Sequence, residues 1–215
     1  MNSQPAKVLS ICVGKPKTVM VNGHAVYTAI FKTPVDGKVT LKKLNLDGDE
    51  QADLTVHGGP DKAVYSYPIE HYEWWRDKLP GVDFPNGKFG ENLTTKGLLE
   101  SDVCIGDEFQ IGTAVIKVAQ PRIPCYKLGV KFGRSDVIKM FLRSGRSGIY
   151  FSVVQEGEFA TGDEFKFLRG DGLNVGVQDV ANLFTGPHAV NRDVILRALD
   201  SQLADQMKSF ISGLL

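Results

Sequence analysis

The first 170 residues alternate short apolar runs with turn-forming residues, and the remainder carries apolar residues at helical spacing. Runs rich in β-branched and aromatic residues that end at turn residues are typical of strands. Such runs occupy residues 7–14, 25–31, 38–44, 114–120 and 148–154. Many short strands separated by turns predict a closed or partly closed β-barrel, so we expect a mainly β fold with some helix.

Two helices are expected to interrupt the strands. In YPIEHYEWWRDKLPG (67–81), Pro68 suits the first helical position, and Pro80-Gly81 ends the pattern. In SDVIKMFLRSG (135–145), Ser135 is a candidate N-cap. The apolar positions of the first segment fall near one helical face: Ile69, Tyr72, Trp75 and Leu79.

The C-terminal part of the chain predicts a small helical unit. Helical spacing recurs at residues 174–184, 191–200 and 201–215. The last of these carries an apolar stripe made of Leu203, Met207, Phe210, Ile211 and Leu214. We therefore expect a barrel domain at 1–170 followed by a helical unit at 171–215.

Composition excludes several classes of protein. The 25 basic residues balance the 25 acidic ones, so bulk attraction to nucleic acid or to an anionic membrane is not indicated. No apolar run is long enough for a membrane helix, and the N-terminus lacks a signal-peptide pattern. The expected location is the cytoplasm.

The three cysteines, Cys12, Cys104 and Cys125, are widely spaced. This spacing argues against a disulfide scaffold, and the absence of CxxC argues against a structural zinc site. An iron–sulfur cluster usually takes four cysteine ligands, and the chain has three. No GxGxxG or P-loop motif is present. Cys12 and Cys104 lie in strand-like contexts and are expected to be packing residues.

The stretch QPRIPCYKLG (120–129) surrounds Cys125 with unusual neighbours. Arg122 and Lys127 could favour the reactive thiolate, and Pro121 and Pro124 stiffen the chain on its approach. A free cysteine is, however, more often a small buried apolar residue. Spacing alone favours packing over reactivity.

Three glycine-containing loops could bind a ligand or simply form turns. In VHGGPDK, the amides of Gly58 and Gly59 with Lys62 could form an anion nest, and His57 and Asp61 lie beside them. The other two loops are KFGENLTTKGL, where Asn92 and Thr94 could hydrogen-bond a polar ligand, and RSGRSG, where Arg143 and Arg146 could bind phosphate.

In combination these segments resemble the MOSC family, named for the C-terminal domain of molybdenum cofactor sulfurase. The branch they are most similar to confers resistance to 6-N-hydroxylaminopurine. The matching stretches run in the family's order through about residues 45–158. They are LDGDEQADLTVHGGPDKAVYSYPIEHY, FGENLTTKGLLESDVCIGDEF, VAQPRIPCYKL and GIYFSVVQEGE.

The resemblance implies a MOSC-type barrel and a molybdenum–pyranopterin cofactor. It makes Cys125 the molybdenum ligand, which suits a soft thiolate. Arg122, Lys127, Arg146 and the HGGPDK loop would bind the cofactor's phosphate. The resemblance also implies that His57, Asn92 and Thr94 contact the pterin or the substrate.

The implied reaction reduces an N-hydroxylated compound, such as 6-N-hydroxylaminopurine, to the amine. Cys125 and His57 would be its catalytic residues, with His57 as the proton donor. Because the sequence shows no flavin or iron–sulfur signature, the electrons would come from a separate donor protein. The chain is expected to be a monomer or homodimer.

Two other functions stay open at this point. Cys125 and His57 could act as nucleophile and base in a hydrolase or transferase, with Asp61 orienting the histidine. The protein could also carry the cofactor or a sulfur atom without turnover.

Overall fold

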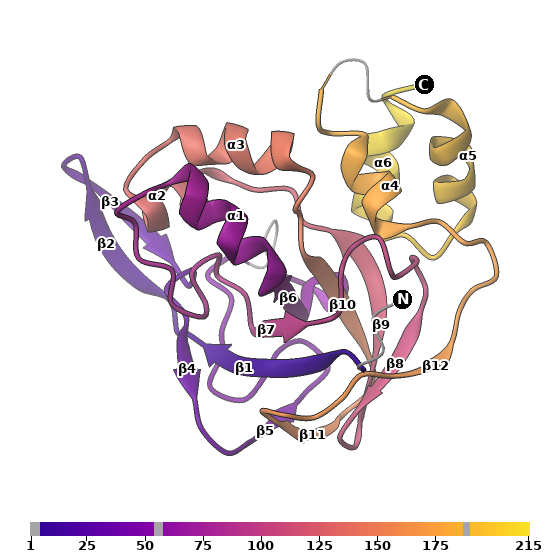
Figure 1. Ribbon diagram of the computed structural model, residues 1–215, viewed down its shortest axis with the longest axis horizontal. Coiled ribbons are helices and arrows are strands. Elements are labelled where there is room, and N and C mark those ends of the chain that lie inside the picture. Colours follow the sequence, from indigo (N-terminus) through magenta and orange to yellow (C-terminus); the bar gives the residue numbers. More distant parts are fainter. Residues whose placement is uncertain (1–4, 54–57, 187–189) are drawn as a thin grey trace.

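The computed structural model describes residues 5–53, 58–186 and 190–215 (Figure 1). Its main feature is a curled sheet in the order β12-β8-β9-β10-β6-β7-β1-β4. These strands are β1 Lys7–Val13, β4 Thr33–Val35, β6 Val64–Pro68, β7 Leu93–Lys96, β8 Glu108–Ile111, β9 Ala114–Pro121, β10 Ile149–Gln155 and β12 Lys166–Arg169. Two further sheets pair β2 Lys17–Val21 with β3 His24–Thr28, and β5 Lys38–Leu41 with β11 Gly157–Ala160.

Backbone hydrogen bonds bring the two sides of the curled sheet together. Val8 N donates to Asp163 O (2.9 Å), and Phe165 N donates to Ala6 O (2.8 Å). The start of β1 thereby meets the segment that leads into β12. The result is a half-barrel whose two sides are joined by a few backbone hydrogen bonds. This arrangement confirms the predicted mainly β architecture with inserted helices.

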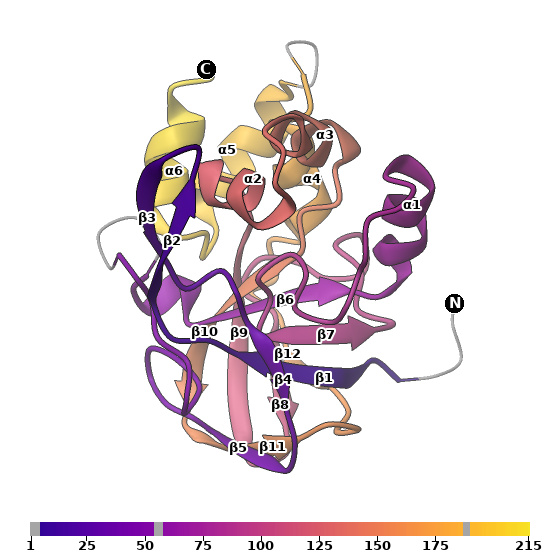
Figure 2. The same ribbon diagram turned by 90° about the vertical axis from the view of Figure 1, so that its left-hand side faces the viewer.

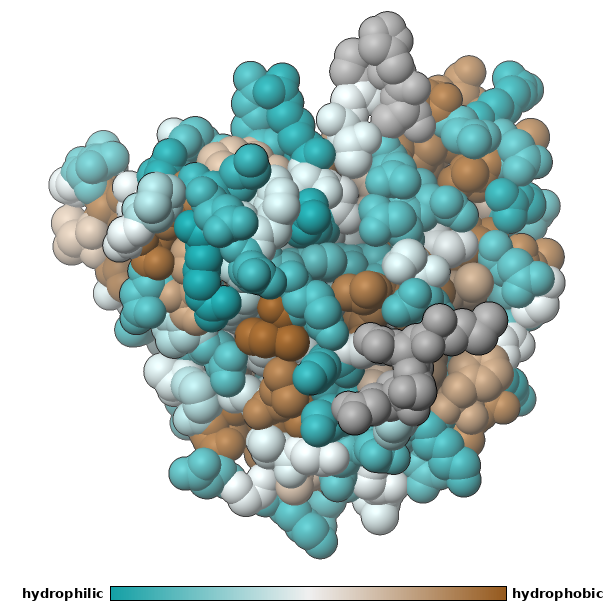
Figure 3. Space-filling view, in the orientation of Figure 1, coloured by the Kyte–Doolittle hydropathy of each residue, from teal (hydrophilic) through white to brown (hydrophobic). Residues whose placement is uncertain are grey.

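Six helices gather on one side of the described structure, and most strands lie on the other (Figures 1 and 2). They are α1 Glu70–Lys78, α2 Tyr126–Phe132, α3 Asp136–Ser144, α4 Val177–Asn182, α5 Arg192–Asp200 and α6 Asp205–Ser212. A short 3-10 turn, η1 Pro60–Lys62, precedes β6. The connection from β6 to β7 contains α1 and joins a parallel pair of strands. On the face seen in Figure 3 the surface is mainly hydrophilic, with separate hydrophobic patches.

The predicted helix around α1 forms, but it begins later than expected. Pro68 is the last residue of β6, and the helix begins at Glu70. The chain stays paired through Pro68 because Ile69 N donates to Thr95 O of β7 (2.8 Å). Ser135 does stand directly before α3, but its side chain makes no capping hydrogen bond because its backbone is already helical.

Two hydrophobic clusters stabilise this arrangement. The larger joins barrel residues such as Phe109 and Phe151 to tail residues such as Val177 and Ile211. Helix α4 packs against β9, and α5 packs against α4 and α6, so the predicted tail helices share one hydrophobic cluster with the barrel. The second cluster is largely aromatic and lies beneath α1, α2 and α3, with the rings of Tyr67 and Phe89 stacked 4.2 Å apart.

Candidate functional site

Cys125 lies at the end of the segment that leaves β9, where α2 begins. Its backbone is extended, and it occupies the N-cap position of that helix. The side chain is half-buried and borders two cavities, both of which also touch Tyr150 of β10. The structure therefore places the thiol at a cavity wall instead of in the core.

The larger cavity, called here the apolar cavity, has a volume of about 290 Å³. It lies between helix α6 and strands β9 and β10. Its lining residues are Lys62, Gln120, Ile123, Pro124, Cys125, Tyr150, Gln206, Met207 and Phe210.

The smaller cavity, called here the cationic cavity, has a volume of about 100 Å³. Its lining residues are Thr28, Ala29, Ile30, Lys32, Glu50, Gln51, Ala52, Gly90, Arg122, Cys125, Lys127 and Tyr150. Three cations face a single carboxylate, Glu50, which is exposed and lies 3.8 Å from Lys15. This lining favours an anionic occupant.

Arg122 and Lys127 are both buried beside Cys125. The Arg122 guanidinium donates to the carbonyl oxygen of Phe89 and lies 4.6 Å from the ring centre of Tyr65. Within the described ranges, no carboxylate is in ion-pair distance of Arg122 or Lys127. Two buried cations without a carboxylate partner are unusual, and they favour a site for an anion.

Lys32 differs because it already has an anionic partner. Its ammonium contacts the Asp49 carboxylate, and both side chains are buried. Burial lowers the pKa of Lys32, and the interaction with Asp49 opposes this shift. Lys32 therefore contributes less net positive charge to the cationic cavity than Arg122 or Lys127.

Tyr150 stands where the two cavities meet. Its ring lies 4.8 Å from that of Tyr65. Burial raises the pKa of Tyr150, and the nearby Arg122 only partly offsets this. The phenol therefore stays protonated at neutral pH, and the residue lines both cavities.

The HGGPDK loop lies next to the apolar cavity. Gly58, Gly59, Asp61 and Lys62 line a third cavity of about 300 Å³, which shares Lys62, Gln120 and Gln206 with the apolar cavity. Gly59 has φ +94°, a conformation that favours glycine. Lys62 Nζ donates to Gln206 Oε1 of α6 (2.6 Å). The predicted donor His57 lies outside the described residues.

Asn92 and Thr94 support the fold and do not line either cavity at Cys125. Asn92 is buried, accepts from Tyr65 N (3.1 Å) and donates to Asp49 Oδ2 (2.9 Å). The Thr94 hydroxyl donates to Glu91 Oε1 (3.0 Å). Their polar groups bind the protein itself, so the placement favours a structural role over the predicted ligand contact.

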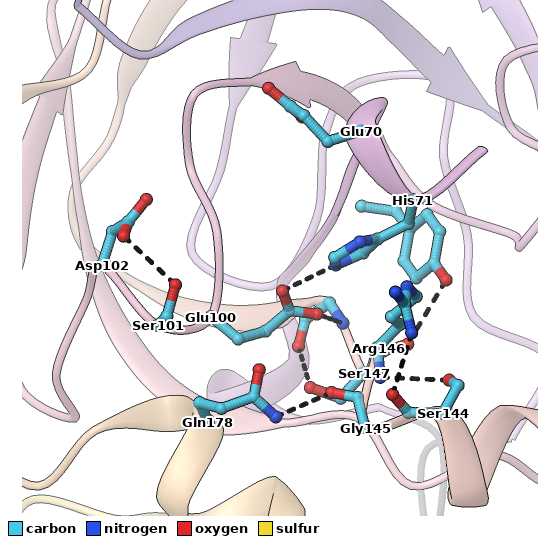
Figure 4. Close-up of polar contacts among 12 residues, drawn as sticks. Glu70, His71, Glu100, Ser101, Asp102, Ser144, Gly145, Arg146, Ser147 and Gln178 are labelled. Atoms are coloured by element: carbon cyan, nitrogen blue, oxygen red, sulfur yellow. Dashed lines mark hydrogen bonds and ion pairs between the residues drawn. The ribbon is translucent and has the colours of Figure 1, made fainter. Parts of the chain in front are cut away.

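Arg146 belongs to a different polar cluster, shown in Figure 4. Its guanidinium lies 4.5 Å from the ring centre of Trp74 and donates to Ser144 O (3.2 Å). The same cluster contains a pair between His71 and Glu100, 2.8 Å apart. Arg146 is not among the residues that line either cavity at Cys125.

Several lining residues escaped the sequence reasoning. Gln120 and Tyr150 stand on expected strands, but no local signal marks them as ligand-binding. Lys32 gives no sequence signal at all. Phe210 belongs to the apolar stripe of the last helix, yet it is 60% exposed and lines the apolar cavity.

The other two cysteines are not placed for chemistry. Cys12 is buried, and burial raises its pKa to about 11, so the unreactive thiol dominates at neutral pH. Burial also raises the pKa of Cys104, which lies near β8 and lines neither cavity. Over the described residues, no group of three or more His, Cys, Asp or Glu side chains could hold a metal ion.

Replacing Cys104 with alanine should leave any cofactor content and turnover close to wild type. The residue is half-buried and lines neither cavity at Cys125, so only a modest loss of packing is expected. Metal analysis and steady-state rates of the purified variant would check this. A complete loss of activity in a variant that still melts cooperatively would show that Cys104 has a functional role.

Sequence comparison identifies similar proteins over most of the chain. The MOSC domain family model matches residues 53–166. Protein YflK from Bacillus subtilis (strain 168) is 42% identical over 199 residues, which is 93% of this chain and 89% of that protein. Protein YiiM from Escherichia coli (strain K12) is 47% identical over 133 residues, which is 61% of this chain and 59% of its own length.

A protein named reductase from Gibberella moniliformis is 34% identical over 77% of this chain, which spans only 30% of that protein. Among solved structures, YiiM from Geobacillus stearothermophilus has a TM-score of 0.79 at 33% identity, covering 97% of this chain and 98% of its own. YiiM from Escherichia coli has a TM-score of 0.74 at 30% identity. No helix in the described residues is long and apolar enough to cross a membrane.

Proposed function

Because this chain belongs to the MOSC domain family, we propose that it binds the molybdenum cofactor through Cys125 and reduces small N-hydroxylated compounds to amines. The observation that carries the proposal is the position of Cys125, which borders both an apolar and a cationic cavity. One cavity suits a substrate ring, and the other suits an anion. The fungal relative named reductase supports the class of reaction.

The residues present fit such a cofactor. A thiolate is a soft ligand suited to the metal, and a single protein ligand leaves positions for oxygen and substrate. Arg122 and Lys127 are buried without a carboxylate partner in the described structure, so they would bind the cofactor's anionic groups. Gly58, Gly59 and Lys62 would contribute from the adjoining cavity.

The net reaction breaks the N–O bond of R–NH–OH. It consumes two electrons and two protons and gives R–NH₂ and water. When bound, the cofactor supplies the reducing equivalents and the acceptor for the oxygen. The protein's own residues hold the substrate and deliver protons, and a separate donor protein would restore the electrons.

Tyr150 is the described residue best placed to direct a proton. It touches both cavities beside Cys125, and its raised pKa keeps the hydroxyl protonated. Hydrogen bonding to the departing oxygen would help water leave. His57 remains the other proposed donor.

Metal and pterin analysis tests the proposal directly. The protein would be purified from a host that makes molybdenum cofactor, and then supplied with an artificial reductant and 6-N-hydroxylaminopurine. The expected result is near-stoichiometric molybdenum and pterin, together with formation of adenine. Absence of both from freshly prepared protein would overturn the proposal. Full metal content with no amine product would instead indicate a carrier.

Replacing Tyr150 with phenylalanine should lower kcat by about tenfold or more with molybdenum content unchanged, because the proton-donating hydroxyl is lost. Since a raised pKa keeps a phenol protonated to higher pH, the wild-type rate should not fall between pH 6 and 9 through ionisation of this tyrosine. Steady-state rates across that range would check both statements. Tyr27→Phe, on the exposed β2–β3 hairpin, is the matched control. Equal rates for the two variants would remove Tyr150 from the mechanism.

A further inference from the structure

We propose that Gln120 and helix α6 determine which substrate is accepted, by binding a planar nitrogen heterocycle in the apolar cavity. This inference rests on the proposed function and assigns the residues of the same site that select its substrate. It concerns two features that the family resemblance did not identify, namely a buried glutamine on β9 and the C-terminal helix.

Gln120 is the first of these features. The residue is 3% exposed, and its Oε1 has no hydrogen-bond partner in the described part of the chain. A buried carboxamide without a partner is costly, so such groups usually mark a site that a ligand or water completes. Gln120 lines the apolar cavity, stands opposite Tyr150 in the sheet register, and precedes Cys125 by five positions. Its side chain therefore belongs to the wall of the cavity that the thiol also borders.

The walls of the apolar cavity suit a flat ring. Tyr150 and Phe210 offer aromatic surfaces, and Met207 and Ile123 add a thioether and an aliphatic surface. Aromatic and sulfur-containing side chains pack favourably against other π systems. The volume of about 290 Å³ lies at the small end of ligand pockets, which fits a free base better than a nucleotide.

Phe210 is unusual for a large apolar side chain because it is 60% exposed. Its ring lies 5.3 Å from that of Phe184, so its position is defined by a neighbour. A ligand in the apolar cavity would cover part of this exposed ring. Burial of that surface would contribute to binding.

Helix α6 is held in place against the barrel. Lys62 Nζ donates to Gln206 Oε1, and Ala204 N, at the start of the helix, donates to Ala119 O of β9 (3.3 Å). The second contact joins α6 to the residue directly before Gln120. The helix and the glutamine are therefore positioned together, and they form one side of a single subsite.

This subsite has a defined chemical preference. A carboxamide offers one acceptor and two donors, and the edge of a nitrogen heterocycle presents matching N–H groups and ring nitrogens. N-hydroxylated heterocycles should therefore bind much better than N-hydroxylated aliphatic amines, which lack both the flat ring and the polar edge.

Direct binding measurements test this inference without depending on turnover. Adenine and 6-N-hydroxylaminopurine would be titrated by ligand-observed NMR into the full chain, both cofactor-loaded and cofactor-free. The variants are Gln120→Leu and Phe210→Ala, with Gln110→Leu on β8 as the control because its amide bonds Gly112 O away from the cavities. We expect each test variant to weaken binding by about tenfold or more, and the control to match wild type.

The outcomes are distinguishable. Tight binding that depends on Gln120 and Phe210, without any reduction, would sustain this inference and reject the proposed function. Reduction of the substrate, together with wild-type affinity in both test variants, would sustain the proposed function and reject this inference. Failure of the wild type to bind either base in either form would overturn the inference. If Gln120→Leu does not fold, the affinity of Phe210→Ala tests the inference. This variant should fold, because the Phe210 side chain is already largely exposed.

Discussion

Replacing Cys125 with serine is expected to remove molybdenum from the purified protein and to abolish reduction of N-hydroxylated substrates. Loss of a residue that merely orients a ligand typically weakens metal affinity by about 10–100-fold, so loss of the proposed ligand itself should exceed that range. A serine hydroxyl is a poor substitute because it is harder than a thiolate and stays protonated at neutral pH. Inductively coupled plasma mass spectrometry and single-turnover assays would measure the two effects.

The fold of this variant should survive for a specific reason. Cys125 is the N-cap of α2 and makes no capping hydrogen bond, whereas serine is among the best N-cap residues. The melting temperature should therefore be unchanged or slightly higher. Cys104→Ala provides the cysteine-removal control. A Cys125→Ser protein that retains metal and activity would show that the ligand lies elsewhere.

The strands around the site were predictable because their segments are rich in β-branched and aromatic residues and end at turn residues. The expected strands at 114–120 and 148–154 correspond to β9 and β10, which carry Gln120 and Tyr150. Helix α2 was not predicted. It has seven residues, contains Gly129 and starts without a side-chain cap, so local propensity does not indicate it. Burial of Leu128 against the rest of the protein stabilises the helix.

The composition of the site was predictable only in part. The sequence indicates Arg122 and Lys127 because they flank Cys125, and in the structure they line the cationic cavity together with it. Lys32 and Phe210 come from distant segments, and only tertiary structure brings them to Cys125. The sequence indicates Asn92 as a ligand residue because amides often bind ligands, but its hydrogen bonds go to Tyr65 and Asp49. A residue's type does not reveal whether its hydrogen bonds are used within the protein.

The contacts that close the half-barrel could not be predicted from the sequence either. The contacts between Val8 and Asp163 and between Ala6 and Phe165 use backbone atoms alone. Such pairing leaves little trace in side-chain identity, because any residue except proline offers the same N–H and C=O groups. The presence of many short strands could be anticipated from the sequence, but neither all twelve described strands nor the pairs that meet could.

Replacing Glu91 with alanine is expected to lower the free energy of unfolding by about 3–5 kcal/mol. This carboxylate belongs to the FGENL motif, directly before the predicted ligand residue Asn92, and is fully buried. It accepts hydrogen bonds from the Tyr72 hydroxyl, Gly87 N (2.8 Å), Phe89 N (2.9 Å) and the Thr94 hydroxyl (3.0 Å). Alanine would leave these donors unsatisfied in the interior.

The expected loss is large because the four donors come from α1, the 87–89 loop and β7, so Glu91 joins three segments beside the cationic cavity. A typical domain has only about 5–15 kcal/mol of stability. Urea unfolding followed by tryptophan fluorescence would measure the change, with exposed Glu158→Ala on β11 as the matched control at about 0.5 kcal/mol or less. Glu91→Gln keeps one carbonyl acceptor, so its loss of unfolding free energy should lie between those of Glu91→Ala and Glu158→Ala. Equal stability of Glu91→Ala and Glu158→Ala would show that the buried carboxylate serves the site and not the fold.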